Sequence, residues 1–242
     1  MRDFASLAQP RLEAEGLRIV RDGAVLLQVG RLVLEGPGPT LILGPNGAGK
    51  SLLLRCLHGL IRADAGQVRQ DGAVLDARAR QRQAMVFQKP VLLRRSVAAN
   101  LAFVLRALPR RARRERVMAL LEQGGLASKA RQPARSLSGG EAQRLAILRA
   151  LATGPRVLFL DEPTSSLDPA ATQAIEALIL SAAAQGVRIV MVTHDIGQAR
   201  RLGHDIVLMQ GGGVAEHALA DAFFDAPQTQ AARRYLAGAL VL

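Results

Sequence analysis

Residues 40–51 have the sequence TLILGPNGAGKS. The apolar run at 40–44 predicts a short buried strand that ends in glycine, and a helix is expected from Lys50 onward. The segment 44–51 matches the phosphate-binding loop pattern G-x-x-x-x-G-K-[ST]. A strand before the loop and a helix after it favour this interpretation over an ordinary glycine-rich turn.

The glycines of this loop allow the backbone to curl, so that successive N–H groups face a phosphate. Lys50 is expected to reach the β- and γ-phosphates of a nucleotide, and the Ser51 hydroxyl is expected to bind Mg²⁺. The predicted nucleotide-binding residues of this segment are Gly44, Pro45, Asn46, Gly47, Ala48, Gly49, Lys50, Ser51 and Leu52.

Two adjacent carboxylates follow the apolar run RVLFL at 156–160. Asp161 is expected to hold the metal through water, opposite Ser51. Glu162 is placed to accept a proton from the attacking water, or to orient it. The structural alternative is a helix-capping Asp with a neighbouring Glu.

The segment 137–151, LSGGEAQRLAILRAL, places two glycines at the start of a strong helix. In one interpretation Ser138 and Glu141 form a capping box, and the glycines are tolerated in the first turn. In the other, the glycines clear side chains from the helix N-terminus so that an anion can approach it. This segment alone leaves both open.

The remaining pattern is one of apolar strands that alternate with helices, which predicts a largely parallel sheet covered on both faces. Residues 16–35 predict two further strands around a turn at Asp22-Gly23. The Arg-rich stretch at about 89–136 interrupts the alternation and predicts an inserted helical subdomain. The expected strands are 40–44, 84–88, 156–160, 188–193 and 205–210, and the expected helices are 50–60, 97–108, a short one around Val117–Leu121, 139–152 and 169–185.

Composition limits the class of protein. The 242 residues are 49% hydrophobic, which excludes wholesale disorder. No apolar run approaches the ~20 residues of a membrane span, the first sixteen residues do not resemble a secretory signal, and the lone Cys56 excludes an intrachain disulfide. The net charge is +12, and residues 94–135 hold eleven Arg or Lys against two acids. This cluster suits nucleic acid, an anionic membrane, an acidic partner or a solvated helix face.

With the phosphate loop, LSGGE at 137–141 and LFLDEPTSSLD at 158–168 in this order, the chain resembles the ATP-binding cassette (ABC) ATPases over residues 12–236. The resemblance implies an α/β P-loop NTPase fold with a RecA-like core, an N-terminal antiparallel β subdomain and an inserted α-helical subdomain. It divides the single ABC ATPase domain at 1–242 into a nucleotide-binding core (1–87 and 141–242) and a helical subdomain (88–140) that ends in the signature motif.

The resemblance also implies residue roles. Gln88 in VFQKP matches the glutamine that senses Mg²⁺ and the γ-phosphate, which adds it to the metal set of Ser51 and Asp161. His194 in MVTHD matches the switch histidine that contacts the γ-phosphate, so Glu162, His194 and Gln88 form the expected catalytic set. Asp168 in SSLD is expected at a subunit interface.

Cassettes of this family pair head to tail, with ATP between the phosphate loop of one copy and the signature of the other. The resemblance thus implies a second copy of this chain as partner, whose nucleotide contacts Ser138, Gly139, Gly140 and Glu141. Hydrolysis then opens the dimer. The cofactors expected are ATP and Mg²⁺.

The segment 88–106 looks like that of importer cassettes, most similar to those for tungstate, molybdate and phosphate. This implies an ATPase subunit at the cytoplasmic face of a bacterial inner membrane, partnered by a transmembrane permease and indirectly by a solute-binding protein, without the regulatory C-terminal domain of some relatives. The alternative is a soluble ABC ATPase acting on nucleic acid; the short spacing between phosphate loop and signature disfavours it, so no nucleic acid is expected. Glu162 and His194 disfavour a silent regulator.

One departure from the family concerns the base of the nucleotide. The family often has an aromatic residue near 20–22, where this chain has Val20-Arg21-Asp22. Either Arg21 stacks on the adenine as a cation, or the adenine is held loosely. The preference for ATP over GTP is open.

Overall fold

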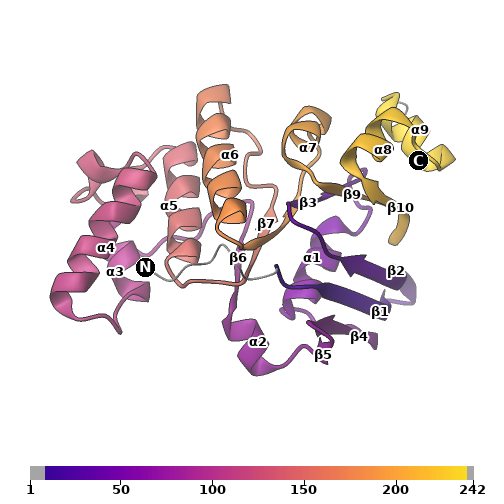
Figure 1. Ribbon diagram of the computed structural model, residues 1–242, viewed down its shortest axis with the longest axis horizontal. Helices are drawn as coiled ribbons and strands as arrows, with labels where there is room; N and C mark the ends of the chain where they lie inside the picture. The colour runs from indigo at the N-terminus through magenta and orange to yellow at the C-terminus, as the bar shows by residue number, and fades with distance from the viewer. Residues whose placement is uncertain (1–8, 239–242) are drawn as a thin grey trace.

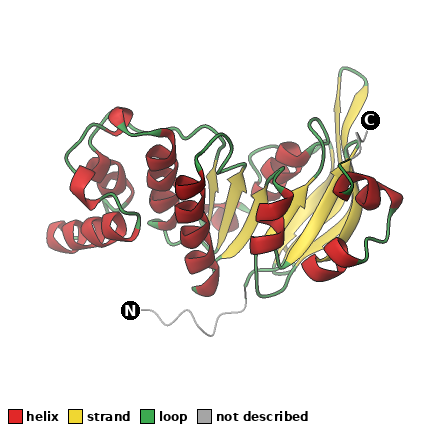
Figure 2. Cartoon of the chain, turned by 90° about the horizontal axis from the view of Figure 1, so that it is seen from above, coloured by secondary structure: helices red, strands yellow, loops and turns green. Residues whose placement is uncertain are grey.

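The chain is built on two β-sheets, and the computed structural model describes residues 9–238 (Figures 1 and 2). One sheet has six strands in the order β10-β9-β3-β8-β7-β6, and the other has four in the order β2-β1-β4-β5. The strands are β1 (Leu12–Arg21), β2 (Ala24–Leu34), β3 (Thr40–Leu43), β4 (Ala65–Gln70), β5 (Ala73–Val74), β6 (Gln83–Val86), β7 (Val157–Asp161), β8 (Arg188–Val192), β9 (Asp205–Gln210) and β10 (Gly213–Leu219).

Nine helices lie between or after the strands within residues 9–238. They are α1 (Lys50–His58), α2 (Ala77–Gln81), α3 (Val97–Val104), α4 (Arg110–Gln123), α5 (Gly139–Leu151), α6 (Pro169–Ala184), α7 (Ile196–Leu202), α8 (Ala220–Asp225) and α9 (Gln230–Leu236), with single 3-10 turns at Ala127–Lys129 and Ala134–Ser136. Within residues 9–238, no helix has both the length and the apolar character needed to cross a membrane.

The six-stranded sheet confirms the parallel arrangement predicted from the sequence. β9, β3, β8, β7 and β6 are parallel neighbours, and only β10 runs antiparallel, beside β9. Because parallel strands end at the same edge, the loop after β3 and the carboxylates of Asp161 and Glu162 at the end of β7 lie at one end of the sheet.

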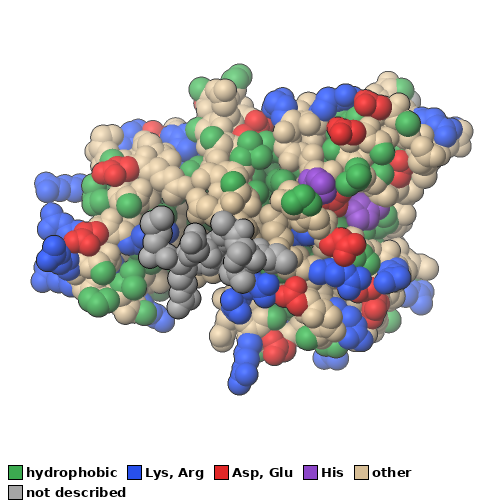
Figure 3. All heavy atoms as spheres, viewed as in Figure 1, with side chains coloured by type: hydrophobic (Ala, Val, Ile, Leu, Met, Phe, Trp, Pro, Cys, Tyr) green, Lys and Arg blue, Asp and Glu red, His purple; other side chains and the backbone are tan. Residues whose placement is uncertain are grey.

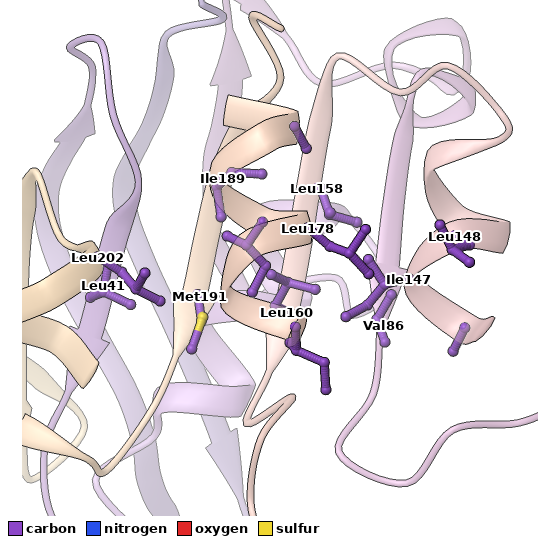
Figure 4. Close-up of a cluster of buried hydrophobic side chains, with 14 of the residues drawn as sticks. Leu41, Val86, Ile147, Leu148, Leu158, Leu160, Leu178, Ile189, Met191 and Leu202 are labelled. Atoms are coloured by element: carbon purple, nitrogen blue, oxygen red, sulfur yellow. The ribbon is translucent and has the colours of Figure 1, made fainter. Parts of the chain in front are cut away.

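Alternate residues of the central strands point to opposite faces of the larger sheet, as the pleat requires. On β7, Leu158 and Leu160 pack toward α5 and α6, within the hydrophobic cluster shown in Figure 4. Val157 and Phe159 pack on the other face, with α1 and the smaller sheet. Both faces are therefore buried, which explains why these strands are continuous apolar runs.

The smaller sheet is the N-terminal antiparallel β subdomain expected from the resemblance. β1 begins at Leu12, four residues before the predicted start. β4 and β5 come from a segment for which no strand was predicted. β5 has only two residues, and Val68 is the only large apolar residue of β4, so neither strand shows the apolar alternation that reveals a half-buried strand.

The segment between β6 and β7 contains α3 and α4, which lie at one end of the molecule, away from α8 and α9 (Figure 1). α3 ends at Val104 rather than at residue 108. Pro109 is the N-cap of α4, and a residue before proline is disfavoured in the helical region. The loop before the signature is hydrogen-bonded to the start of α3, from Val97 N to Gln132 O at 2.9 Å and from Ala134 N to Arg95 O at 2.9 Å.

Candidate functional site

The phosphate loop lies between the end of β3 and the start of α1. Gly44 has φ 144°, and a Cβ placed on it would lie 2.2 Å from the backbone oxygen of Met209. Gly49 is the N-cap of α1 with φ 91°. A side chain at Gly44 would push β9 away, so this loop can pass close to the neighbouring strand only with glycine there.

Lys50 is buried against the loop from which it extends. Its Nζ donates to the backbone oxygens of Gly44 at 2.8 Å and Pro45 at 2.9 Å. Burial lowers the pKa of Lys50, while the nearby charges of Glu162 and Asp161 raise it. An ammonium group has three donors, so one proton is free of these two carbonyls to meet a phosphate oxygen.

Two of the residues predicted to bind the metal, Ser51 and Asp161, are in direct contact. Ser51 Oγ donates to Asp161 Oδ1 at 2.7 Å. Arg55 Nη2 lies 3.5 Å from Asp161 Oδ2. A hydroxyl and a carboxylate are hard oxygen ligands, and Mg²⁺ is commonly held by one or two such groups together with phosphates and waters. The residues present therefore fit Mg²⁺.

The three residues expected to be catalytic meet at a single oxygen atom. Gln88 Nε2 donates to Glu162 Oε2 at 3.3 Å, and His194 Nδ1 lies 3.3 Å from the same oxygen. Glu162 has φ 47°, a left-handed conformation rarely adopted by non-glycine residues. Its N–H is held by Val192 O at 3.0 Å. The end of β7 is thus strained in a way that places this carboxylate between Gln88 and His194.

Two hollows adjoin at Asn46 and Glu162. The first, about 310 Å³, is lined by the phosphate loop together with Leu26 and Glu162. The second, about 480 Å³, is lined by Gly44, Pro45, Asn46, Gln88, Glu162, His194 and Tyr235. Because Asn46 and Glu162 line both hollows, the phosphate loop and the three residues expected to be catalytic share one site.

Leu26 and Tyr235 line these hollows although the sequence pattern did not single them out. Arg21, considered for stacking on the base, is not among the lining residues. Its Nη1 instead lies 3.0 Å from Asp64 Oδ2. Leu26 instead provides an exposed apolar side chain beside the phosphate loop.

A buried hydrogen-bond network supports the loop that carries His194. Thr193 Oγ1 donates to Gln198 Oε1 at 2.9 Å, and Gln198 Nε2 donates to Glu176 Oε1 at 3.0 Å. The same amide also contacts Thr164 Oγ1 at 3.0 Å. The histidine loop and the segment after Glu162 therefore share one buried support.

The predicted signature residues are arranged as a capped helix start. Glu141 N donates to Ser138 Oγ at 3.4 Å, and Ser138 N donates to Glu141 Oε2 at 3.0 Å. The Lys129 ammonium also donates a hydrogen bond to the Glu141 carboxylate. This bond and the one from the Ser138 N–H lower the pKa of the Glu141 carboxyl. The capping box is therefore real. Asp168 likewise caps α6, accepting from Ala171 N at 2.8 Å.

The signature residues and Asp168 do not line either hollow of their own chain, as far as the described residues extend. The phosphate loop, Asp161, Glu162, Gln88 and His194 come together, whereas Ser138–Glu141 and Asp168 lie apart from them. A model of the family described as "ABC transporter" matches residues 36–165.

The chain belongs to the ABC transporter family. A phosphate import ATP-binding protein of Natronomonas pharaonis is 37% identical to it, over 98% of this chain and 89% of that protein. A tungstate uptake ATP-binding protein of Peptoclostridium acidaminophilum is 40% identical, over 84% and 94%.

Solved structures of this family have the same fold. CbiO1 of Clostridium perfringens, part of the ABC transporter complex cbiONQ, superposes with a TM-score of 0.80 at 29% identity, over 89% of this chain and 91% of that one. The cassette MJ0796, a dimer in a post-hydrolysis state with ADP and Pi, has a TM-score of 0.78 at 27% identity, over 86% and 98%. The chain is an ATP-binding, ATP-hydrolysing member of this family.

The two glycines of the ABC signature differ in their surroundings. A Cβ on Gly140 would lie 2.6 Å from the Cβ of Ala171 on α6. A Cβ on Gly139 would meet nothing closer than Leu167 Cδ2 at 3.5 Å, an ordinary contact. The sequence interpretation gave both glycines the task of admitting an anion. The structure adds a packing reason for Gly140, because only glycine lets α5 lie this close to α6.

We expect Gly140→Ala to destabilise the ABC domain by about 1–3 kcal/mol, the cost of an overpacked contact. Gly139→Ala is the matched control, and it should leave the thermal midpoint unchanged or slightly higher. Thermal unfolding of the two variants, followed by circular dichroism, makes the comparison. Equal midpoints would contradict the packing role of Gly140.

Proposed function

We propose that this chain is the ATPase subunit of an ABC importer for an oxyanion of the tungstate, molybdate and phosphate class. The observation that carries the ATPase proposal is the meeting of Gln88 and His194 on one oxygen of Glu162, beside the phosphate loop. The oxyanion class is supported by the phosphate and tungstate relatives, and by a probable anion import protein of Haloferax volcanii that is 38% identical.

In this proposal the chain binds the triphosphate through the loop N–H groups and Lys50. Ser51, Asp161 and Gln88 would hold Mg²⁺, and the bound metal would offset the negative charge of the phosphates. Glu162 takes a proton from the attacking water as the water oxygen bonds to the γ-phosphorus. The bond from that phosphorus to the bridging oxygen breaks, which releases ADP and phosphate. His194 donates a hydrogen bond to the γ-phosphate.

A second copy completes the site in this proposal. Ser138 and Gly139 are exposed at the start of α5, where backbone N–H groups and the helix dipole favour an anion. They are separate from their own chain's hollows, so the phosphate they meet belongs to a partner in a two-fold, head-to-tail dimer. Asp168, also exposed, lies at the interface.

Ser138→Arg should leave ATP binding by the monomer unchanged and abolish the ATP-driven dimer, because a long side chain would fill the approach to the α5 N-terminus. Size-exclusion chromatography with ATP in a non-hydrolysing background measures this. Ser136→Arg, at an exposed residue two positions earlier, is the control for added charge. A dimer that persists in Ser138→Arg would contradict the trans arrangement.

A membrane permease is the proposed second partner. An apolar groove of about 200 Å³, lined in part by Phe87, Val91 and Val104, adjoins Gln88. Val91 is 71% exposed, and such apolar exposure marks interaction sites. We place a cytoplasmic segment of the permease here. We further propose that residues 88–140 form the helical subdomain and that this subdomain binds the permease.

The basic charge of the helical subdomain supports a location at a membrane face. Five arginines lie on α4, and Lys and Arg side chains gather over this end of the molecule in Figure 3. Basic segments are attracted to anionic lipid headgroups. These arginines are also the observation that favours the second candidate function, an ATPase acting on nucleic acid.

The deciding experiment is reconstitution of the cassette with its co-purified membrane partner and binding protein. Tungstate, molybdate or phosphate should stimulate ATP hydrolysis, whereas glutamate and methionine should not; importers of both amino acids are also among the relatives, at 35% and 37% identity. Stimulation by an amino acid alone would refute the oxyanion class. If RNA or DNA stimulates ATP hydrolysis, and if the protein elutes from a heparin column together with nucleic acid, the second function would be favoured.

A further inference from the structure

The C-terminal helix α9 is anchored by a buried acid. The carboxylate of Glu216, which is 7% exposed, accepts from Gln228 N at 3.0 Å, Thr229 N at 2.8 Å and Thr229 Oγ1 at 2.7 Å. Thr229 in turn caps α9, accepting from Ala232 N at 3.1 Å. These bonds fix the entry to α9, so a side chain near its end has a defined position.

That side chain is Tyr235, the only tyrosine in a chain without tryptophan. It lines the second hollow together with the phosphate loop, Gln88, Glu162 and His194. Burial raises the pKa of the Tyr235 phenol, a hydrogen bond with the Gly44 backbone lowers it, and the charge of Glu162 raises it. The side chain of Tyr235 lies beside both the loop and the carboxylate, because Gly44, Pro45, Asn46 and Glu162 line the same hollow.

We propose that the Tyr235 hydroxyl is a positioning group of the ATP site, which holds the turn at 44–46 in place opposite the Glu162 carboxylate. Helix α9 thereby completes the wall around the γ-phosphate. The inference rests on the proposed roles of Glu162 and Gln88. It adds a residue from α9 that no sequence motif of the chain contains.

The first test uses the intrinsic emission of Tyr235. In the absence of tryptophan, tyrosine emission reports this one side chain, and Tyr235→Phe should reduce the signal to background. Binding of ATP with Mg²⁺ to a Glu162→Gln chain should change the emission, because the γ-phosphate arrives beside the ring. Bound radiolabelled ATP without a change in emission would overturn the inference. No bound ATP would instead refute the proposed ATPase site.

The second test separates positioning from packing. Tyr235→Phe keeps the ring and removes the hydroxyl, and it should lower kcat about fivefold, the effect of one lost hydrogen bond, with KM and the thermal midpoint unchanged. Arg234→Gln, an exposed neighbour on α9, is the control and should retain the parent kcat. An unchanged kcat, or a raised KM at the parent kcat, would overturn the inference.

Discussion

Glu162→Gln is expected to stop ATP hydrolysis almost completely while ATP still binds. Loss of a general base lowers the rate by about two to four orders of magnitude, and the amide keeps the size of the side chain but cannot take up the proton. The phosphate loop and Lys50 are unchanged, so the nucleotide remains bound and holds two copies together.

Single-turnover release of phosphate and size-exclusion chromatography with ATP measure the two effects. Glu115→Gln is a matched control, since Glu115 lies exposed on α4 and pairs only with Arg111 among the described residues. It should hydrolyse ATP at the parent rate. If Glu162→Gln did the same, the general-base assignment would be wrong.

Lys50→Ala is expected to weaken ATP binding by about ten- to a hundredfold. The Lys50 ammonium is the buried cation at the loop, and hydrogen bonds to charged groups contribute about 1.5–3 kcal/mol. Its loss also leaves the carbonyls of Gly44 and Pro45 without their donor, so the loop loses order before the nucleotide arrives.

Equilibrium binding of radiolabelled ATP, and of ADP for comparison, gives the change in affinity. The loss should be larger for ATP, because Lys50 is proposed to contact the γ-phosphate. Lys89→Ala, an exposed lysine outside both hollows, is the control. Unchanged affinity in Lys50→Ala would refute the phosphate-loop assignment.

The nucleotide half of the site was predictable because each of its parts is local. The loop at 44–51 fits a pattern fixed by backbone conformation, and the carboxylates follow an apolar strand whose two-sided burial is visible in the sequence. Parallel topology then brings these strand ends to one edge. No long-range contact has to be known in advance.

Other features depend on contacts that the chain order does not reveal. β10 is an edge strand whose one buried residue is the acid Glu216, while its Leu219 is exposed, so neither an apolar run nor strict alternation marks it. Gly140 packs against Ala171 of α6, and thirty residues separate the two in the sequence. The signature pattern already explained this glycine, so nothing in the sequence separately indicated its packing role. Tyr235 reaches the phosphate loop from a helix near the other end of the chain.

Helix α5 connects the segment after β6 to the predicted signature residues. Gln143 Nε2 donates to Phe87 O at 3.2 Å, and Arg149 Nη2 donates to Val91 O at 2.6 Å, so α5 is tied twice to the segment that follows β6. Its thirteen residues form a helix about 20 Å long, and Ser138 and Gly139 stand at its N-terminus. Helix α5 therefore joins the segment at 87–91, which contains Gln88, to the helix start that is proposed to meet the nucleotide of a partner.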